Sequence, residues 1–336
     1  EMRKEYLGGE TIETIYWGGG TPSQLDKEDF ETIFYYLHKN YSISSHPEIT
    51  LEANPDDLTP DYIAMLRTLP FNRLSMGIQT FNESILKVLQ RRHTARQAIE
   101  AFQNCRAAGF QNISIDLMYG LPGETLSTWQ QDLDQALLLH PEHLSAYHLI
   151  YEEDTVLWKL REQHKVEEAD EDLSVSLFST LIDRLTSEGY DHYEISNFSL
   201  PGLYSRHNSS YWTEKKYLGC GPSAHSYNGV SRQWNVASLD TYIKGISAGT
   251  PVFEIEELDL YTRYNDFVIT RIRTEWGMPL SKLRDEFGEK LYDYCLRMAA
   301  PHLKQGTLEL VNDILKLTRK GIFISDGIMS DMLWTD

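Results

Sequence analysis

The chain has 336 residues, 41% of them hydrophobic and 24% charged, so it can bury a sizeable core and should form one large domain with a smaller one. Its formal net charge of −19 disfavours a nucleic-acid partner, because phosphate binding needs clustered Lys and Arg. No apolar run approaches the roughly 20 residues that cross a bilayer, so we expect a protein that is not transmembrane and assign it to the cytoplasm.

The first 200 residues alternate short β-rich runs with helical stretches. Strands are predicted over 11–16, 48–52, 73–78, 112–117, 143–150 and 190–195. Helices are predicted over 26–39, 60–68, 82–89, 95–108, 126–139 and 171–188. This alternation predicts βαβ units and a parallel sheet, either doubly wound or curled into a full or partial barrel. Function is then expected at the carboxyl ends of the strands.

The pattern changes after about residue 258, where helices dominate. Helices are predicted over 260–273, 280–287 and 289–304, followed by β-like runs over 308–311 and 314–318 and a last helix. This arrangement predicts a small winged-helix-like domain, a fold that often binds DNA. Acidic side chains outnumber basic ones along these helices, so a packing or protein-contact module is the favoured interpretation.

A glycine-rich loop follows the first predicted strand, in Tyr16-Trp17-Gly18-Gly19-Gly20-Thr21-Pro22. Consecutive glycines let a polar ligand approach the backbone N–H and C=O groups. Phosphate binding would predict a Lys-Ser/Thr end and a helix immediately after it, and neither is present. By itself the loop is also compatible with a tight connection that binds nothing.

Polar side chains stand at the ends of three later strands. Glu52 ends an otherwise apolar run, Gln79 follows another, and Asp116 lies in a third. Each alone would more often be a structural cap, because a buried carboxylate or amide needs only one good partner. Because the ends of successive parallel strands meet at one edge of a sheet, the three together with the triglycine loop predict a small-molecule site.

These segments, in this order and spacing, carry a family resemblance. Gly-Gly-Gly-Thr-Pro, Glu-Ala-Asn-Pro, Ser-Met-Gly-Ile-Gln-Thr-Phe and Ile-Asp-Leu-Met-Tyr-Gly-Leu-Pro resemble those of the oxygen-independent coproporphyrinogen III oxidase-like radical S-adenosylmethionine (SAM) proteins. The resemblance covers nearly the whole chain and implies a partial (β/α)₆ barrel followed by a winged-helix-like domain. It implies a barrel over 1–200, a connecting region over 201–258 and the C-terminal domain over 259–336.

In this family SAM chelates the open iron of a [4Fe–4S] cluster. Carried over by position, the resemblance assigns to SAM the residues Gly19, Gly20, Thr21, Glu52, Gln79, Arg91 and Asp116. The loop residues and the glutamate would meet the methionine amino group, the arginine the methionine carboxylate, and the glutamine and aspartate the ribose hydroxyls. Arginine matches a carboxylate bidentately, whereas carboxylate and amide oxygens accept hydrogen bonds from vicinal hydroxyls.

The family holds its cluster with a Cys-x₃-Cys-x₂-Cys loop, which does not occur in this sequence. The three cysteines, Cys105, Cys220 and Cys295, are too far apart to replace it or to indicate a disulfide framework. We therefore assign no metal ligand within the chain and expect the first barrel strand and the cysteine loop upstream of Glu1. A degenerate member without a cluster is the alternative. Cys105 and Cys295 sit in helical patterns and are predicted core thiols.

The family contains an enzyme, which oxidatively decarboxylates two propionates of coproporphyrinogen III, and a heme chaperone of the HemW type, which delivers heme to acceptor proteins. Residues 205–212 contain His-Asn-x-x-Tyr-Trp, which resembles the motif of the chaperone branch, and a glycine-rich turn follows at 218–225. The resemblance makes His207 a candidate axial heme ligand, with Tyr211 and Trp212 supplying flat surface. Alternatively, His207 caps a loop and the aromatic rings pack in the core.

The chaperone is the favoured function, and the oxygen-independent coproporphyrinogen III oxidase is the alternative. An oxidase must grip the propionates with cations, and the region 190–227 offers few of them, namely Arg206, Lys215 and Lys216. A third possibility is a barrel enzyme that uses Glu52 and Asp116 for acid–base chemistry without SAM. Nothing in the sequence supplies a metal or nucleophile partner for it, so we assign no catalytic residue.

Overall fold

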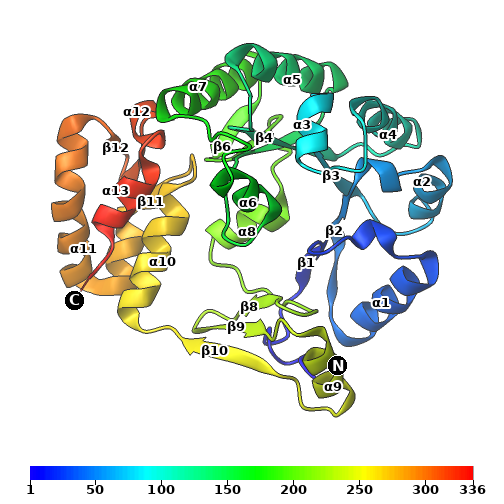
Figure 1. Cartoon of the computed structure of the whole chain (residues 1–336). Coiled ribbons are helices and arrows are strands. Elements are labelled where there is room, and N and C mark those ends of the chain that lie inside the picture. The colour runs from blue at the N-terminus through cyan, green and yellow to red at the C-terminus, as the bar shows by residue number, and fades with distance from the viewer. Residues whose placement is uncertain (336) are drawn as a thin grey trace. The chain divides into compact units, whose positions relative to one another are not determined.

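The computed structural model describes residues 1–335, which divide into two compact units (Figure 1). The barrel unit comprises Glu13–Tyr35 and Ser44–Ser205. The second unit comprises Glu1–Ile12, Tyr36–Ile43 and the chain from Arg206 onward.

A 7-stranded sheet forms the barrel unit, in the order β1-β2-β3-β4-β5-β7-β6. Its strands are β1 (Ile12–Trp17), β2 (Ile43–Ala53), β3 (Arg73–Gln79), β4 (Ile113–Tyr119), β5 (His143–His148), β6 (Asp191–Glu194) and β7 (Asn197–Ser199). The pairs β2–β3, β3–β4 and β4–β5 are parallel, whereas β7 is antiparallel to both β5 and β6. The predicted fold class, a partial radical SAM barrel, is confirmed.

The strand predicted over 190–195 is β6, one arm of a hairpin, and the unpredicted β7 lies antiparallel between it and β5, which corrects the expectation of an all-parallel sheet. The turn closes because Glu194 Oε2 accepts hydrogen bonds from the Ser196 N–H and from Asn197 Nδ2. Only a short connection separates the two arms, and parallel strands would need a crossover of a dozen or more residues.

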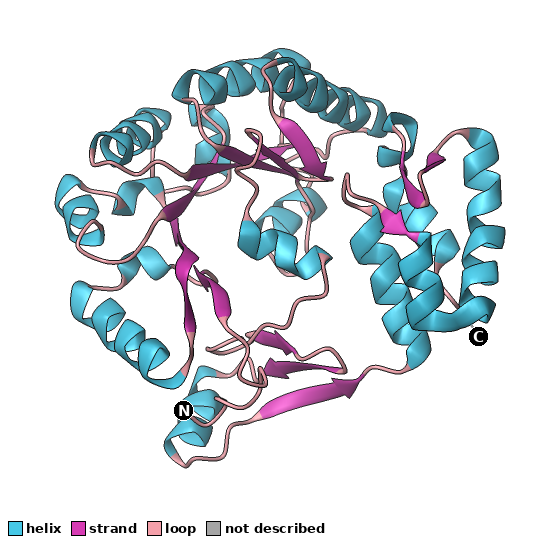
Figure 2. Ribbon diagram, turned by 180° about the vertical axis from the view of Figure 1, so that it is seen from behind, coloured by secondary structure: helices cyan, strands magenta, loops and turns pink. Residues whose placement is uncertain are grey.

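Helices cover the outer face of the curved sheet (Figure 2). They are α1 (Lys27–Asn40), α2 (Pro60–Leu66), α3 (Glu83–Val88), α4 (Ala95–Ala107), α5 (Leu126–Leu139) and α7 (Glu171–Ser187), with 3₁₀ turns at Pro22–Gln24 and Pro55–Asp57. A further helix, α6 (Val156–Glu162), is not part of this outer layer and packs on a small apolar cluster that includes Leu121 and Leu149. Thr94 and Thr125 begin α4 and α5 with capping boxes, which satisfy the first backbone N–H groups. Helix α6 was not predicted, because it is short and has no fully buried residue.

The strands alternate apolar residues on the helix-covered face with polar residues on the inner face. Leu51, Leu74 and Ile115 are fully buried. At the alternate positions, which face the inner side, Glu52 pairs with Ser75 and Ser75 pairs with Ser114 in the strand register. Parallel strands buried on both faces normally read as continuous apolar runs. A polar inner face therefore indicates a barrel interior built around a ligand.

The part of the second unit after the barrel starts with α8 (Arg206–Trp212), which is followed by a 3-stranded antiparallel sheet in the order β10-β9-β8. Its remaining elements are β8 (His225–Tyr227), β9 (Ser231–Asn235), α9 (Leu239–Ser247) and β10 (Phe253–Glu257). None of these elements was predicted. The strands are short, and the residues at which they begin and end depend on their pairing with neighbouring strands.

The C-terminal part has the predicted winged-helix-like fold. It consists of α10 (Leu260–Ile272), β11 (Met278–Pro279), α11 (Leu280–Gln305), β12 (Leu308–Val311), β13 (Ile314–Leu317), α12 (Arg319–Ile322) and α13 (Ser325–Met332). Gly288, at φ 78°, breaks α11 into the two helices that were predicted. The strand β11 was missed, because its two residues are recognisable only from their pairing with β13.

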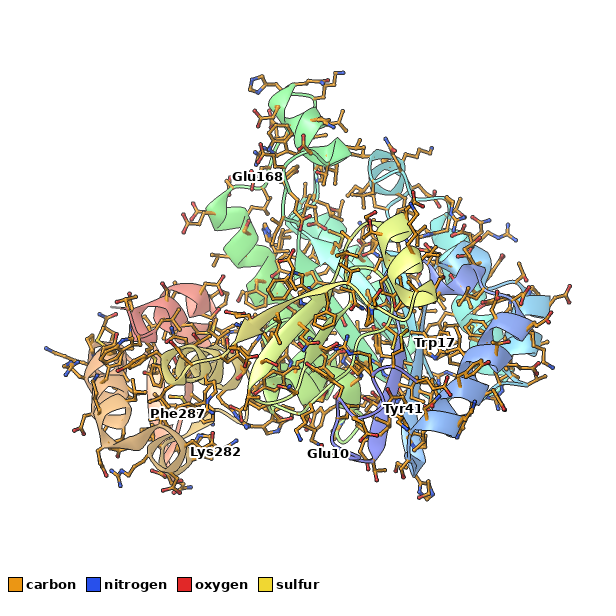
Figure 3. The ribbon with its side chains drawn as sticks, turned by 90° about the horizontal axis from the view of Figure 1, so that it is seen from below. Glu10, Trp17, Tyr41, Glu168, Lys282 and Phe287 are labelled. Atoms are coloured by element: carbon orange, nitrogen blue, oxygen red, sulfur yellow. The ribbon has the colours of Figure 1, made fainter. Side chains whose placement is uncertain are left out.

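Basic side chains in the C-terminal part lie against aromatic rings or form ion pairs with acidic side chains. Phe267 and Phe287 lie 5.4 Å apart between ring centroids, and Lys282 Nζ lies 5.4 Å from the Phe267 ring (Figure 3 labels Lys282 and Phe287). Lys282 and Arg271 both pair with Glu214, at 2.7 and 3.2 Å. These contacts fit a packing role for the cations better than a nucleic-acid surface.

The predicted core thiols are confirmed: Cys105 and Cys295 are buried and free. Burial raises the pKa of Cys105 to about 12 and that of Cys295 to about 11, so neither thiol ionises near neutral pH. Within residues 1–335, no helix has the length and apolar character needed to span a membrane.

Candidate functional site

The loop after β1 is built around Glu52 at the end of β2. The Tyr16 hydroxyl donates to Glu52 Oε1 at 2.6 Å, and the Gly19 N–H donates to Oε2 at 3.2 Å. A Cβ on Gly18 would lie 2.5 Å from Tyr16 Cε1 and 2.8 Å from Glu52 Oε1, so only glycine fits there. Burial, and then Glu52, raise the pKa of Tyr16, which keeps its hydroxyl protonated as a donor. The carboxylate is thus held against the glycine loop.

Gln79 and Arg91 meet over the backbone of Gly77 at the end of β3. Gln79 has a φ of +70°, which L-residues rarely adopt, and the β3–β4 register shifts between Gly77 and Gln79. A Cβ on Gly77 would lie 3.0 Å from Gln79 Nε2 and 3.5 Å from Arg91 Nη2. The bulge therefore re-aims the amide into the space beside the guanidinium.

The Arg91 guanidinium is only partly satisfied by the protein. Its Nη2 donates to Asn54 Oδ1 at 2.7 Å and to the Gly77 carbonyl at 2.9 Å. Its Nε is buried and has no hydrogen-bond partner among residues 1–335. Burial lowers the pKa of Arg91. A buried donor without a partner is uncommon and points to an acceptor supplied by a ligand.

Asp116 lies beside Gly77 in the β3–β4 register. The Ser75 hydroxyl lies within 3.3 and 3.4 Å of its two carboxylate oxygens. Burial, and then the Glu52 carboxylate, raise the pKa of Asp116 to about 6, while Arg73 and the serine hydroxyl act in the opposite direction. Ser75 is also the register partner of Glu52, so Glu52 and Asp116 lie on the same inner face of the sheet.

The predicted SAM residues therefore divide into two groups. The structure brings Gly19 against Glu52, sets Gln79 beside Arg91, and couples Asp116 electrostatically to Glu52. Gly20 and Thr21 continue the glycine loop in exposed positions, and among the residues described neither forms a hydrogen bond with the Glu52 carboxylate.

Sequence reasoning missed a polar layer deeper in the barrel. Arg73 is 1% exposed, and its Nε has no partner among the described residues. His143 bonds to the Ser114 hydroxyl at 2.8 Å and to the Tyr193 hydroxyl at 2.7 Å. Burial, and then Arg73, hold the pKa of His143 well below its usual value, so this ring is neutral. A polar residue at every second strand position was the signal that could have revealed this layer.

Two buried acids that were also missed hold the loops after the strands. Asp132 on α5 accepts hydrogen bonds from the Thr80 hydroxyl and from the Phe81 N–H at 2.9 Å, next to Gln79. Glu124 Oε2 accepts from the N–H groups of Gly120, at 2.7 Å, and Leu121, at 3.3 Å. An acid on the apolar face of a predicted helix was the signal for Asp132.

The hydrogen-bonding groups at the strand ends match those of SAM. Glu52 offers a carboxylate to a cationic amine, Arg91 offers an unused donor to a carboxylate, and Asp116 offers acceptor oxygens to hydroxyls. The described residues do not fit an iron–sulfur cluster, because no group of three or more His, Cys, Asp or Glu among them could hold a metal ion.

The predicted heme residues lie on α8 in the second unit. His207 Nε2 and the Tyr211 hydroxyl are 3.0 Å apart, and their rings meet edge to face at 5.2 Å. Trp212 contacts a different residue, because Arg273 Cζ lies over its ring, 4.2 Å from the centroid. The structure therefore brings His207 and Tyr211 together but not Trp212.

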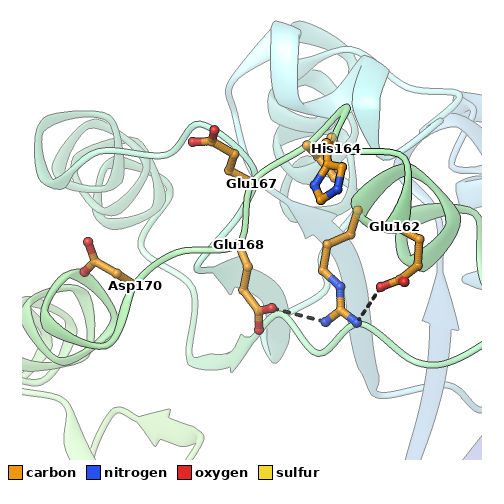
Figure 4. A pocket seen from close by; sticks show the side chains of 7 residues that line it. Glu162, His164, Glu167, Glu168 and Asp170 are labelled. Carbon is orange, nitrogen blue, oxygen red and sulfur yellow. Dashed lines mark hydrogen bonds and ion pairs between the residues drawn. The ribbon is translucent and has the colours of Figure 1, made fainter.

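A surface pocket beside α6 contains none of the predicted site residues (Figure 4). Arg161 lies within it between Glu162 and Glu168, at 3.3 and 3.1 Å. Because its charges pair with one another in an exposed position, this pocket gives no reason to move the candidate site away from the strand ends.

The barrel and the polar residues at its strand ends define the class of a radical SAM protein. Residues 2–136 match the Radical SAM superfamily, and residues 258–324 match the HemN C-terminal domain. The solved structure of coproporphyrinogen III oxidase (HemN) from Escherichia coli superposes with a TM-score of 0.83 at 23% identity, covering 98% of this chain and 81% of that one.

Relatives with full-length similarity identify the branch. "Heme chaperone HemW" of Lactococcus lactis is 32% identical over 97% of this chain and 86% of its own length. The protein of the same name from Mycobacterium tuberculosis is 31% identical over 99% of this chain and 84% of its own. The chain belongs to the HemW family of radical SAM proteins, as predicted. Membership of the radical SAM superfamily implies SAM and a [4Fe–4S] cluster as cofactors.

Proposed function

We propose that this protein is a heme chaperone, which binds heme and transfers it to acceptor proteins. The observation that carries the proposal is the similarity to proteins named heme chaperone HemW over nearly the whole of both chains. The similarity to HemN concerns the fold alone and favours no activity. Heme-accepting proteins are the proposed partners, and the cytoplasm is the proposed compartment.

The second unit supports this function with an imidazole and aromatic rings on one helix. His207 and Tyr211 are one helical turn apart and touch, and Tyr211 is 37% exposed. We propose this surface of α8 as part of the heme site, with His207 as a candidate iron ligand. Trp212 then stabilises the helix through its contact with Arg273.

The strand-end residues of the barrel are proposed to bind SAM in the manner described. When bound to a cluster, SAM supplies radical chemistry. What this chain's residues do is bind and orient it: Glu52 holds the amino group, Arg91 the carboxylate, and Gln79 and Asp116 the ribose. We propose that residues 1–200 serve SAM, 201–258 serve heme, and 259–336 serve packing or protein contact.

The competing activity is decarboxylation of coproporphyrinogen III. That substrate carries propionates and needs free cations, but Lys216 pairs with Glu10 and Arg232 with Glu256 and Asp266. These pairs commit two of the cations near α8 and β8–β10 to acids of the protein, which favours the chaperone.

Two measurements on the full-length protein test the proposal. A Soret-band titration should show stoichiometric heme binding, weakened in His207→Ala. An anaerobic assay with SAM and a reductant should show no protoporphyrinogen formation. Product formation would place the protein with the oxidases, and failure of the wild type to bind heme would refute the chaperone function. Heme binding that His207→Ala leaves unchanged would remove only the proposed ligand.

A further inference from the structure

The sheet β8–β10 has one covered face and one face that is open near His225, whereas Arg232 on that second face pairs with Asp266 of α10. Ser231, Gln233 and Asn235 of β9 are buried, and Arg3 lies over this face, with its guanidinium 4.9 Å from the Phe253 ring. The alternate residues, Arg232 and Trp234, are only partly buried. Side chains of a strand alternate between faces, so the residues paired with Arg232 and Trp234 share the open face.

His225 stands on this open face directly opposite Trp234. The two residues pair across β8 and β9, and their rings are stacked, with centroids 6.0 Å apart and planes inclined by 29°. Trp234 is fixed from the other side, because its Nε1 donates to Glu254 Oε2 of β10 at 3.1 Å. The tryptophan therefore sets the plane of the imidazole, as an outer partner orients a metal-ligating histidine.

The ring nitrogens of His225 are uncommitted. The side chain is exposed, and no hydrogen bond or ion pair to its ring occurs within the part of the chain that the structure describes. By contrast, His207 Nε2 is engaged by the Tyr211 hydroxyl at 3.0 Å and would have to give up that bond to bind iron. An oriented, exposed imidazole with uncommitted nitrogens is the more readily used metal ligand.

A row of aromatic rings connects the two histidines within the second unit. Tyr211 of α8 contacts Tyr217 at 4.8 Å between centroids, and Tyr217 lies 6.1 Å from Tyr227. Tyr227 is two residues after His225 on β8 and therefore points to the same face. The ring planes are inclined by 76° and 34°, so the row is an aromatic border on the face that carries His225.

We infer that His225 is an axial ligand of the iron when the protein holds heme, with Trp234 as the residue that positions it. This inference rests on the proposed function. A neutral imidazole nitrogen donates its lone pair to the iron, and no covalent bond of the heme is broken. Trp234 would hold the imidazole in place through the stacked rings, and the tyrosine rings on the same face would offer aromatic surface to the bound heme.

The position of His225 also suits release. A chaperone must exchange its own iron ligand for one on the acceptor, and a ligand on an exposed strand can be approached from solvent. Of the acids near it, Glu256 is paired with the Arg232 cation, whereas Glu254 accepts a hydrogen bond from the neutral Trp234 N–H and keeps its charge.

The test compares the full-length wild type with His225→Ala, Trp234→Leu and His207→Ala in ferric heme titrations, followed by absorbance and electron paramagnetic resonance. His46→Ala, an exposed histidine of the barrel unit, is the control. We expect His225→Ala to lose the histidine-ligated spectrum and at least tenfold in affinity, with an unchanged far-ultraviolet circular dichroism spectrum. Trp234→Leu should keep the ligand but broaden its signal, and added imidazole should restore the ligated spectrum of His225→Ala.

The outcomes separate this inference from the proposed function. If the wild type binds heme and His225→Ala keeps both spectrum and affinity, His225 is not the ligand and the chaperone proposal stands. If only His207→Ala loses the ligated spectrum, the ligand is on α8 and the inference is overturned. If the wild type binds no heme, the proposed function itself fails.

Discussion

The clearest quantitative expectation concerns the Asp116 carboxylate and the pH at which SAM binds. Its pKa is raised to about 6, chiefly by burial and secondly by Glu52. The ionised form is the one that accepts hydrogen bonds from the ribose, so affinity should be present above pH 6 and lost as the pH falls through it. The carboxylate is about 90% ionised at pH 7 and about 10% at pH 5, which predicts an affinity about tenfold lower at pH 5.

The substitution Asp116→Asn isolates this contribution, because it keeps the size of the side chain and removes the titrating group. At pH 7 the variant should lose about 1–3 kcal/mol of SAM binding, the range for a hydrogen bond to a charged group, or about 5- to 150-fold in affinity. Its remaining affinity should show a smaller decrease between pH 7 and pH 5. Wild-type and variant curves should therefore approach each other at acid pH.

Calorimetric titration of SAM into the cluster-reconstituted full-length protein at several pH values measures both curves. Asp61→Asn, an exposed aspartate at the start of α2, is the matched control and should follow the wild type. If Asp116→Asn keeps the wild-type pH dependence, another group titrates and the assignment of Asp116 to the ribose loses its support.

Three further expectations test other parts of the structure. Arg91→Ala should weaken SAM by about 1–3 kcal/mol in the same titration, and unchanged affinity would contradict its role with the methionine carboxylate. Burial raises the pKa of Glu124 from 4.5 to about 7, so this carboxyl keeps its proton in the folded protein at pH values where the unfolded chain loses it. The free energy of unfolding should therefore fall by about 3 kcal/mol as the pH rises from 4.5 to 7. Glu124→Gln should remove that part of the slope in urea unfolding; an identical slope would disprove it. Removing the iron should leave the far-ultraviolet circular dichroism spectrum intact, because the strands pack through apolar faces; its loss would show that the cluster supports the fold.

The sequence alone was sufficient for the features that depend on local patterns. Except for α6 and β7, the strands and helices of the barrel follow from apolar runs and capping residues, and the break in α11 follows from Gly288. The positions of Glu52 and Asp116 followed as well, because a polar residue at the end of an apolar strand is visible without knowing its neighbours. Their roles in binding SAM stay predictions.

Only the tertiary structure decided which side chains meet. The β6–β7 hairpin and the β8–β10 sheet depend on pairing between short segments, whose local propensities are too weak to reveal them. The burial of Arg73 and the stacking of His225 on Trp234 depend on which strands pair and in which register. No local pattern in the sequence shows that pairing. Periodicity along a chain shows which residues are buried, whereas the partner of each residue is set by the pairing of whole elements.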